Sequence, residues 1–319
     1  MEALNEILGA MKLSGAVILE AEFSAPWCVR SKIDPDDCRP FTRVPEQIIA
    51  YHYVLEGGLV LKLGDGEPIE ATRNDLVIVS RNEPHVLGSA VDLAPADAND
   101  LIEQATDGGP ARIRHGGGGA RTRILCGFLG SSDANNPLLQ SLPSVLKLSV
   151  NAERLGSFIE SSMRYAMLEL SSGGAESSAS LARLAELLFG ESIREYVRRQ
   201  PPGTDDWLAG LSDPYVGRAL ALLHRRFDHP WTLEALAREV GLSRSALSDR
   251  FVQYLKVSPM RYLGRRRLEE AAARLRTSRK SVAEIAAEVG YDSEAAFSRS
   301  FKRAFGVAPA GYRQMHASG

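Results

Sequence analysis

The sequence predicts an α+β protein of several domains: an N-terminal antiparallel β-barrel with an αα-hairpin, then an all-α domain. Three observations predict it. The hydrophobic pattern changes from strand-like to helix-like near residue 151. A short unit occurs twice, at 248–262 and again at 298–312. The charge also divides, because residues 213–319 carry 19 Lys and Arg against 11 Asp and Glu (net +8), whereas residues 1–212 carry 19 against 29 (net −10).

The barrel is expected at residues 1–150, where short apolar runs alternate with turns. The sequence GDG at 64–66 predicts a hairpin turn between two strands, and the polar, glycine-rich stretch 96–120 predicts a loop. Many short strands separated by turns favour an antiparallel barrel or sandwich. The strand-like runs are SGAVILEAEF, IIAYHYVL, GGLVLKLGDGE, NDLVIVS and TRILCGFL.

Residues 151–200 predict two amphipathic helices joined by a turn at SGGAESS. Leu155, Ile159, Met163 and Met167 lie at steps of four, and a second apolar stripe follows in SLARLAELLFGESIREYVRR. We expect this αα-hairpin to form a lid on the barrel, a dimerisation face or both, or to relay a signal. The Pro, Gly and Asp residues in 201–212 predict a linker.

The repeated unit predicts two helix–turn–helix motifs within residues 213–316. In the first copy, Thr232 and Ser243 are expected N-caps, and Gly241 occupies the turn between the two helices. The second copy repeats this pattern at an offset of 49 or 50 residues. Aromatic and leucine side chains that match between the copies are expected in the core: Phe251, Leu255, Tyr262, Phe301, Phe305 and Tyr312.

The segment between the copies, 259–276, predicts one continuous helix of roughly 27 Å at 1.5 Å per residue. With the helix widths added, the two second helices would lie about 34 Å apart, which is the spacing of successive major grooves on one face of DNA. The basic charge of this region supports a polyanionic partner. The sequence therefore predicts double-stranded DNA as the partner, although a helical interaction domain without DNA would show the same motif.

Residues 213–316 resemble the DNA-binding domain of AraC/XylS-family transcription regulators, chiefly through AEIAAEVGYDSEAAFSRSFKRAFGVAPAGYR in the second half. Asp249 departs from the family pattern, in which a basic or amide residue is common, so the first recognition helix is expected to specify little. The resemblance implies base contacts at Arg244, Ser245, Ser248, Asp249, Ser293, Glu294, Ala295, Ser298 and Arg299. It implies phosphate contacts at Ser243, Arg250, Lys302 and Arg303.

Residues 1–150 resemble the cupin domain that precedes the DNA-binding domain in some AraC-type regulators. His52, Glu56 and Gly64 match the first cupin motif, and His85 ends the match to the second in NDLVIVSRNEPH. Cupins often hold a metal, but Tyr53 stands where a second histidine is expected. Zinc or another divalent metal would suit these donors, and an effector pocket without metal is the other interpretation. The residues expected to line either site are His52, Glu56, His85 and Cys126.

Three cysteines do not form a disulfide framework, and two interpretations of Cys28 and Cys38 stay open. They are inert packing residues, or they form a thiol switch that responds to oxidants. The acidic neighbours of Cys38 in DPDDC would raise its pKa and slow its reaction.

The resulting hypothesis is a cytoplasmic, non-enzymatic transcription regulator, usually an activator in this family. We expect a homodimer that binds promoter DNA, contacts RNA polymerase and responds to a small molecule or a thiol-redox signal. No apolar run approaches the roughly 18 residues of a membrane span, and no signal peptide is apparent. The alternatives are a cupin metalloenzyme with an accessory DNA-binding domain and an architectural protein that binds all DNA equally.

Overall fold

The computed structural model describes residues 2–11, 13–39, 44–103, 111–131, 136–149, 161, 165, 177–199 and 207–317. The chain forms two compact units. We call Met11–Arg199 the β-unit, and Met1–Ala10 together with Gln200–Gly319 the helical unit. Each unit has its own core and is described by itself.

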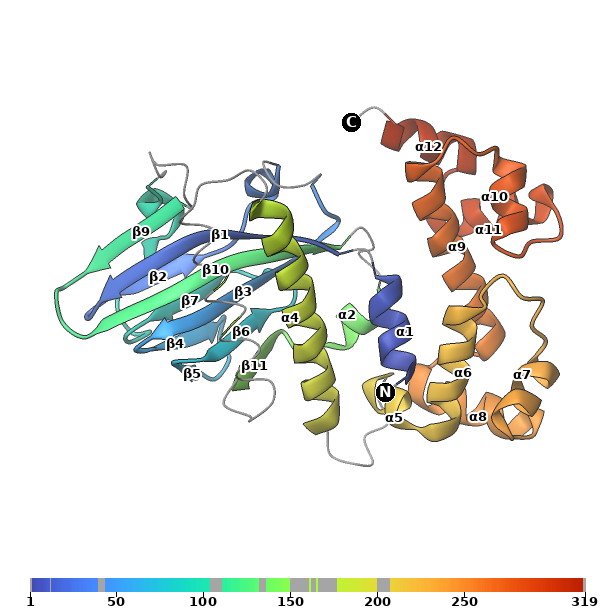
Figure 1. Ribbon diagram of the computed structural model, residues 1–319, viewed down its shortest axis with the longest axis horizontal. Coiled ribbons are helices and arrows are strands. Elements are labelled where there is room, and N and C mark those ends of the chain that lie inside the picture. The colour runs from blue at the N-terminus through green and yellow to red at the C-terminus, as the bar shows by residue number, and fades with distance from the viewer. Residues whose placement is uncertain are drawn as a thin grey trace. The chain divides into compact units, whose positions relative to one another are not determined.

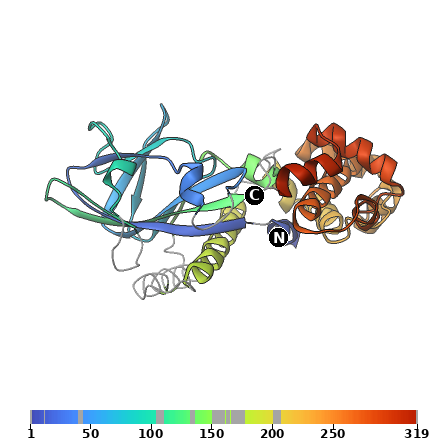
Figure 2. The ribbon, with the colours of Figure 1, turned by 90° about the horizontal axis from the view of Figure 1, so that it is seen from above.

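The β-unit contains two β-sheets that face each other across one apolar core (Figures 1 and 2). The six-stranded sheet has the order β11-β6-β3-β10-β1-β9, and the five-stranded sheet has the order β5-β4-β7-β2-β8. The strands are β1 (Leu13–Ser24), β2 (Cys28–Ser31), β3 (Gln47–Glu56), β4 (Gly58–Leu63), β5 (Ile69–Thr72), β6 (Asp75–Val79), β7 (His85–Gly88), β8 (Ala96–Asp97), β9 (Ala111–Gly116), β10 (Arg121–Ser131) and β11 (Val145–Ser149).

The predicted GDG turn joins β4 to β5, which pair antiparallel, and Gly64 has the positive φ of 51° that this turn requires. Strand β3 lies inside the larger sheet and is buried on both faces. Its even-numbered residues, such as Ala50 and Val54, face the core between the sheets. Ile49 and Tyr51 face the opposite side, so this sheet needs a second cover.

Helix α4 (Ser177–Arg199) supplies that cover on the outer face of the six-stranded sheet (Figure 2). Its buried residues Ala185, Leu188, Ile193 and Val197 recur at helical spacing. A Cβ at Gly15 of β1 would lie 3.4 Å from the Cβ of Ala185 and 2.8 Å from Leu129, so the glycine permits the close approach of helix and sheet. The short helix α2 (Pro137–Ser141) precedes β11.

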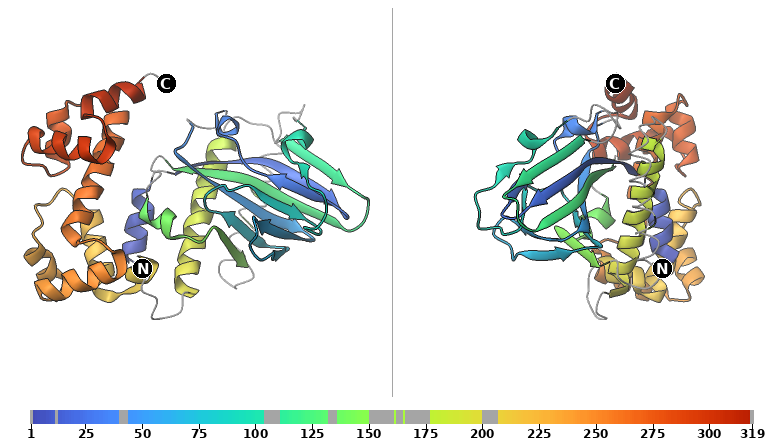
Figure 3. Two further views of the ribbon diagram at one scale, coloured as in Figure 1. Left: turned by 180° about the vertical axis from the view of Figure 1, so that it is seen from behind. Right: turned by 60° about the vertical axis from the view of Figure 1, so that its left-hand side comes forward.

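The helical unit contains both helix–turn–helix motifs, with α9 running from one to the other (Figures 1 and 3). We call the part of the unit around the first motif the first lobe and the part around the second motif the second lobe. Helix α9 is part of both, because its Tyr262 packs against Phe251 in the first and its Leu268, Ala271 and Leu275 enter the core of the second. The helices are α1 (Glu2–Ala10), α5 (Trp207–Ser212), α6 (Pro214–Arg225), α7 (Leu233–Val240), α8 (Arg244–Leu255), α9 (Pro259–Thr277), α10 (Val282–Glu288), α11 (Glu294–Phe305) and α12 (Pro309–Ala317).

Helix α1 is the first element of the chain, yet it packs in the helical unit against α6. Leu4 and Ile7 are buried there. Arg225 at the end of α6 forms ion pairs with Glu2 at 2.6 Å and Glu6 at 2.8 Å. The sequence groups these residues with the barrel, because nothing in their composition distinguishes an amphipathic helix of one domain from that of another.

The predicted fold class is confirmed, with one difference in detail: the N-terminal strands form two facing sheets rather than a closed barrel. Five of the six expected core residues of the repeat are confirmed as buried, and the sixth, Phe305, is half-buried against the core of the second motif. Nearly all of the first helix of the predicted hairpin and residues 201–206 of the predicted linker lie outside the described residues. The other half of the linker, residues 207–212, is helical and forms α5. No helix in the described part of the chain is long and apolar enough to cross a membrane.

Candidate functional site

The two helix–turn–helix motifs share the same local hydrogen bonds. In the first copy, Thr232 accepts from the Ala235 N–H at 3.1 Å, and Ser243 accepts from the Ala246 N–H at 3.2 Å. The second copy repeats both caps: the Glu284 N–H donates to the Ser281 hydroxyl at 3.2 Å and the Ala296 N–H to the Ser293 hydroxyl at 3.3 Å. These caps fix where each recognition helix, α8 or α11, begins.

Gly241 and Gly290 make the two turns, with φ of 80° and 82°. The left-handed conformation costs a residue with a Cβ about 1–2 kcal/mol, so glycine is expected at both positions. Leu247 and Phe297 are fully buried on the inner faces of the recognition helices. The outer faces are therefore free to present polar side chains at equivalent places in both copies.

The predicted base-contacting residues lie in the N-terminal halves of α8 and α11, or at the cap that precedes α11. Ser248 and Ser298 are half-buried, whereas the others are exposed: Arg244, Ser245, Asp249, Ser293, Glu294, Ala295 and Arg299. This is the part of a recognition helix that enters the major groove in helix–turn–helix proteins. Their contacts with bases remain predictions.

The basic side chains of α8 already have protein partners. Arg244 forms an exposed ion pair with Glu234 at 2.7 Å. Arg250 contacts the Asp213 carboxylate at 3.0 Å and lies over the Tyr215 ring. Asp213 is nearly buried and also caps α6, so Arg250 connects α8 to the start of α6. This arrangement gives Arg250 a structural role beside the predicted phosphate contact.

The basic side chains of α11 are arranged differently. Arg299, Lys302 and Arg303 are exposed, and no carboxylate in the described part of the chain forms an ion pair with them. Three cations therefore stand on the second recognition helix without a neutralising partner. Glu294 is the only acidic residue of α11, at its N-terminal end, where the helix dipole favours it.

The two lobes also hold their matching tyrosines with different groups. Tyr262 contacts His224 Nε2 at 2.7 Å, and Tyr312 accepts from Arg276 Nη1 at 2.7 Å. Burial, assisted by the charge of Arg266, lowers the pKa of His224 to about 3, so its imidazole is neutral at physiological pH. His224 Nδ1 is buried without a hydrogen-bond partner.

In the β-unit, the buried His52 and His85 and the half-buried Cys126 meet in one chain of hydrogen bonds between the two sheets. His85 Nδ1 lies 2.8 Å from the Glu83 carbonyl oxygen, so it donates, and His85 Nε2 must accept. His52 Nε2, at 2.8 Å, then donates to His85, and His52 Nδ1 accepts from the Cys126 thiol at 3.1 Å. Burial lowers the pKa of both histidines and raises the pKa of Cys126 to about 12, which fits a chain without charge.

The predicted metal donors do not fit a single ion. His52 directs opposite ring nitrogens to His85 and Cys126, so one metal could not bind all three in this arrangement. Glu56 is exposed at the end of β3 and does not join them. Within the described residues, no three His, Cys, Asp or Glu side chains are placed to hold a metal. The chain of hydrogen bonds instead connects the two sheets.

The cysteines are free thiols held mainly in their protonated form. Cys28 and Cys38 are buried. Burial and the nearby Asp37 raise the pKa of Cys38 to about 11, and burial and Asp92 raise the pKa of Cys28. Because the thiolate is the reactive form, these surroundings favour inert packing over a fast thiol switch.

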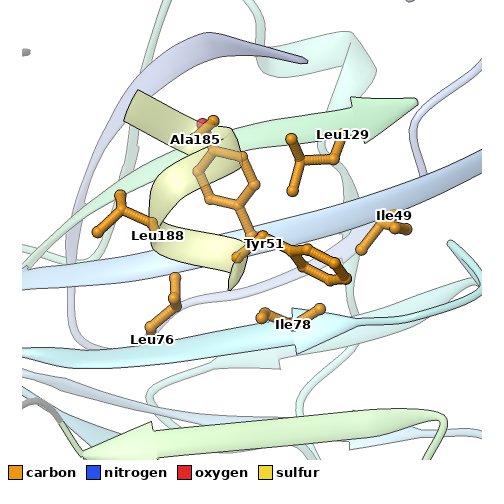
Figure 4. Close-up of a pocket in the computed structure, with 8 residues that line it drawn as sticks. Ile49, Tyr51, Leu76, Ile78, Leu129, Ala185 and Leu188 are labelled. Atoms are coloured by element: carbon orange, nitrogen blue, oxygen red, sulfur yellow. The ribbon is translucent and has the colours of Figure 1, made fainter. Parts of the chain in front are cut away.

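A small apolar pocket that the sequence does not reveal lies between the six-stranded sheet and α4 (Figure 4). Side chains from β3, β6 and β10 meet those of α4 there. The signal was present in β3, whose run IIAYHYVL is apolar on both faces, but the cover could not be assigned. The lining residues are Ile49, Tyr51, Leu76, Ile78, Leu129, Ala185, Leu188 and Phe189.

Comparisons with known proteins cover both units. The Cupin family profile matches residues 2–198, and a helix-turn-helix domain profile matches residues 236–315. An AraC-like transcription regulator of Streptomyces antibioticus is 34% identical over 84% of this chain and 88% of its own length. One of Streptomyces lividans is 30% identical over 98% of both chains. The transcriptional regulator AlkR of Acinetobacter baylyi is 27% identical over 98% of this chain and 99% of its own.

Proposed function

The chain belongs to the AraC-like transcription regulators with an N-terminal cupin domain, and we propose that it binds two successive major grooves of promoter DNA with α8 and α11. That it is a DNA-binding transcription regulator follows from the family.

The observation that carries the proposal is the repeated presentation of two recognition helices on either side of α9. The same caps and the same turn glycines start both helices, and both expose their N-terminal residues. Helix α9 has 19 residues, which is about 28 Å of helix. That length, with the widths of the flanking helices, suits the ~34 Å between successive major grooves.

The two helices contribute unequally in this proposal. Arg299 is free to donate to a guanine edge, and Lys302 and Arg303 are free to contact phosphates. On α8, Asp249 and the Arg244–Glu234 pair leave less positive charge for DNA. We therefore assign most of the affinity to α11 and a smaller share, through Ser245, Ser248 and Asp249, to α8.

The test is selection of bound duplexes from a random pool by the full-length protein, followed by footprinting at fixed salt. We expect two protected boxes one helical turn apart, with affinity at least about 10³-fold above that for scrambled DNA. Equal affinity for scrambled DNA would instead support the architectural alternative. A single protected box would contradict binding by both helices.

For the signal, we propose that the β-unit is the sensor and that a small molecule is the effector. The support is the apolar lining of the pocket under α4 together with the protonated state of all three thiols. An effector larger than a water molecule would have to widen this pocket by moving α4 away from the sheet. Small-molecule binding would have to favour one arrangement of the protein over another to change DNA binding. Leu188→Asp should abolish the response to an apolar effector, whereas Cys28→Ser with Cys38→Ser should leave it intact.

A thiol signal is tested directly by measuring affinity for the selected duplex before and after mild oxidation. A reversible change that disappears in a Cys→Ser variant would overturn the small-molecule proposal. We further propose a cytoplasmic homodimer that contacts RNA polymerase and has no catalytic turnover. The metalloenzyme alternative has no support from the donor geometry around His52 and Glu56.

A further inference from the structure

Arg267 lies near the middle of α9, and its guanidinium donates hydrogen bonds to three backbone carbonyl oxygens. Its Nε donates to Phe227 at 2.7 Å, its Nη1 donates to Gly290 at 2.8 Å, and its Nη2 donates to His229 at 2.8 Å. Burial lowers the pKa of Arg267, but arginine stays charged in proteins. The planar guanidinium holds three acceptors in a fixed geometry that a lysine could not reproduce.

Two of the three acceptors belong to the first lobe of the helical unit and one belongs to the second. Phe227 and His229 lie in the loop between α6 and α7, which leads into the first motif. Gly290 is the turn of the second motif. A Cβ at Gly290 would lie 2.6 Å from the Asp228 carbonyl oxygen and 2.8 Å from Arg267 Nη2, so the loop and the turn are in close contact.

The loop is fixed by packing as well as by these hydrogen bonds. Phe227 packs against the core of the second lobe. The guanidinium groups of Arg266 and Arg274 lie over its ring, at 5.3 Å and 5.7 Å from the centroid. The first lobe therefore places an aromatic side chain on the second, and Arg267 joins the backbones of both.

We propose that Arg267 determines which spacing between its two DNA boxes this protein accepts. The inference rests on the proposed binding of two successive grooves. Adding one base pair between the boxes rotates the second groove by roughly 34–36° about the DNA axis. Two recognition helices that are locked together cannot follow that rotation, whereas helices joined by α9 alone can bend toward it. Arg267 is a positioning residue in this view, since it acts through α8 and α11 and needs no contact with DNA.

The experiment uses the full-length protein and a duplex selected by it from a random pool. Variants of this duplex carry the same two boxes moved apart or together by one or two base pairs. Affinities are measured for the wild type, Arg267→Lys and Phe227→Leu. Arg265→Lys is the matched control, because Arg265 lies on the same helix, has a half-exposed side chain and pairs with Glu269 along the surface of α9.

The wild type and Arg265→Lys should lose about 10-fold or more in affinity for each altered spacing, comparable with a mismatched base pair. Arg267→Lys should reduce that discrimination to about 3-fold or less. Its affinity for the selected duplex should fall by less than the wild type loses at an altered spacing. Phe227→Leu, which loosens the same contact without altering charge, should act in the same direction if Arg267→Lys does not fold.

The outcomes separate two failures. If Arg267→Lys and Phe227→Leu, folded by circular dichroism, keep the discrimination of the wild type, the inference about Arg267 is overturned and two-groove binding stands. If the wild type itself is indifferent to spacing, two-groove binding is overturned, and the inference with it.

Discussion

The two helix–turn–helix motifs have the same backbone design and different electrostatics. Both use a capping hydroxyl, a left-handed glycine and a buried aromatic core at matching positions. In the first motif, however, Arg244 and Arg250 pair with Glu234 and Asp213. In the second, the cations of α11 have no such partner in the described part of the chain. A shared frame thus does not imply a shared contribution to binding.

The difference arises because folding of the motif and binding of DNA depend on different residues. Caps, turn glycines and core aromatics are set by the geometry of the motif, so both copies need them. Surface charges are constrained by DNA binding and not by the fold. One copy can therefore lose positive charge while the other supplies most of the attraction to phosphates.

The largest expected difference between the motifs concerns their turn glycines. Gly241→Ala should destabilise the helical unit by about 1–2 kcal/mol, because only the left-handed conformation is strained and its Cβ meets no atom within 4 Å. Gly290→Ala should cost roughly 3 kcal/mol or more, since its Cβ would also collide with the Asp228 carbonyl and displace Arg267. Urea unfolding followed by tryptophan fluorescence in a Trp27→Phe background measures both.

Gly264→Ala is the control for that pair, because Gly264 lies in α9 with open space around it and alanine is the better helix former. This variant should be neutral or slightly stabilising. Equal costs for Gly241→Ala and Gly290→Ala would mean that the two turns have equivalent surroundings in solution, contrary to the structure.

The next largest difference is expected in DNA affinity. Arg299→Ala should weaken binding to the selected duplex by roughly 10- to 100-fold, the effect of losing about 1–3 kcal/mol of a base contact. Arg244→Ala should have a much smaller effect, and Glu234→Gln should strengthen binding by freeing Arg244. Fluorescence anisotropy at one salt concentration compares the DNA affinities of all three variants. If Arg244→Ala lost as much affinity as Arg299→Ala, the proposal that α11 supplies most of the affinity would be wrong.

A third difference should appear on acidification. The pKa of His224 is about 3 in the folded state, below the ~6.5 of an unfolded chain, so the unfolded state binds the additional proton in that window. The stability that neutral His224 confers is complete above pH 6.5 and falls as the pH decreases. We expect this group to contribute a loss of roughly 1.4 kcal/mol between pH 7.5 and 5.5. The loss should be concentrated in the first motif, because the matching tyrosine of the second, Tyr312, accepts from Arg276 where Tyr262 contacts His224.

Hydrogen exchange, corrected for intrinsic rates, locates this loss, and His224→Gln should remove it. A loss of equal size in the second motif, or one that persists in His224→Gln, would show that another group is responsible.

The smallest expected difference is between the caps. Ser243→Ala and Ser293→Ala remove equivalent hydrogen bonds, so each should destabilise its motif by about 1 kcal/mol. Thermal unfolding of the two variants measures the effect. If one of the two substitutions left the stability unchanged, the two caps would not be equivalent.

The sequence predicted most of what is local. The N-caps, turn glycines and matching core residues were identifiable, because each depends on residues within a few positions of one another. The contacts of Arg250 with Asp213 and of Arg267 with Phe227 were not, since they join residues 37 and 40 positions apart. The pocket under α4 was missed for the same reason, as its lining comes from strands and a helix far apart in sequence.

Helix α1 gives the molecule an unusual connectivity. Because residues 2–10 pack with α6, the polypeptide leaves the helical unit after α1, forms the whole β-unit, and returns to complete the helical unit. The β-unit is thus an insertion within the other unit rather than a preceding module. A fragment that begins at residue 207 would lack helix α1 of the helical unit. A minigene that fuses 1–11 to 207–319 through a flexible spacer would encode all the helices of that unit.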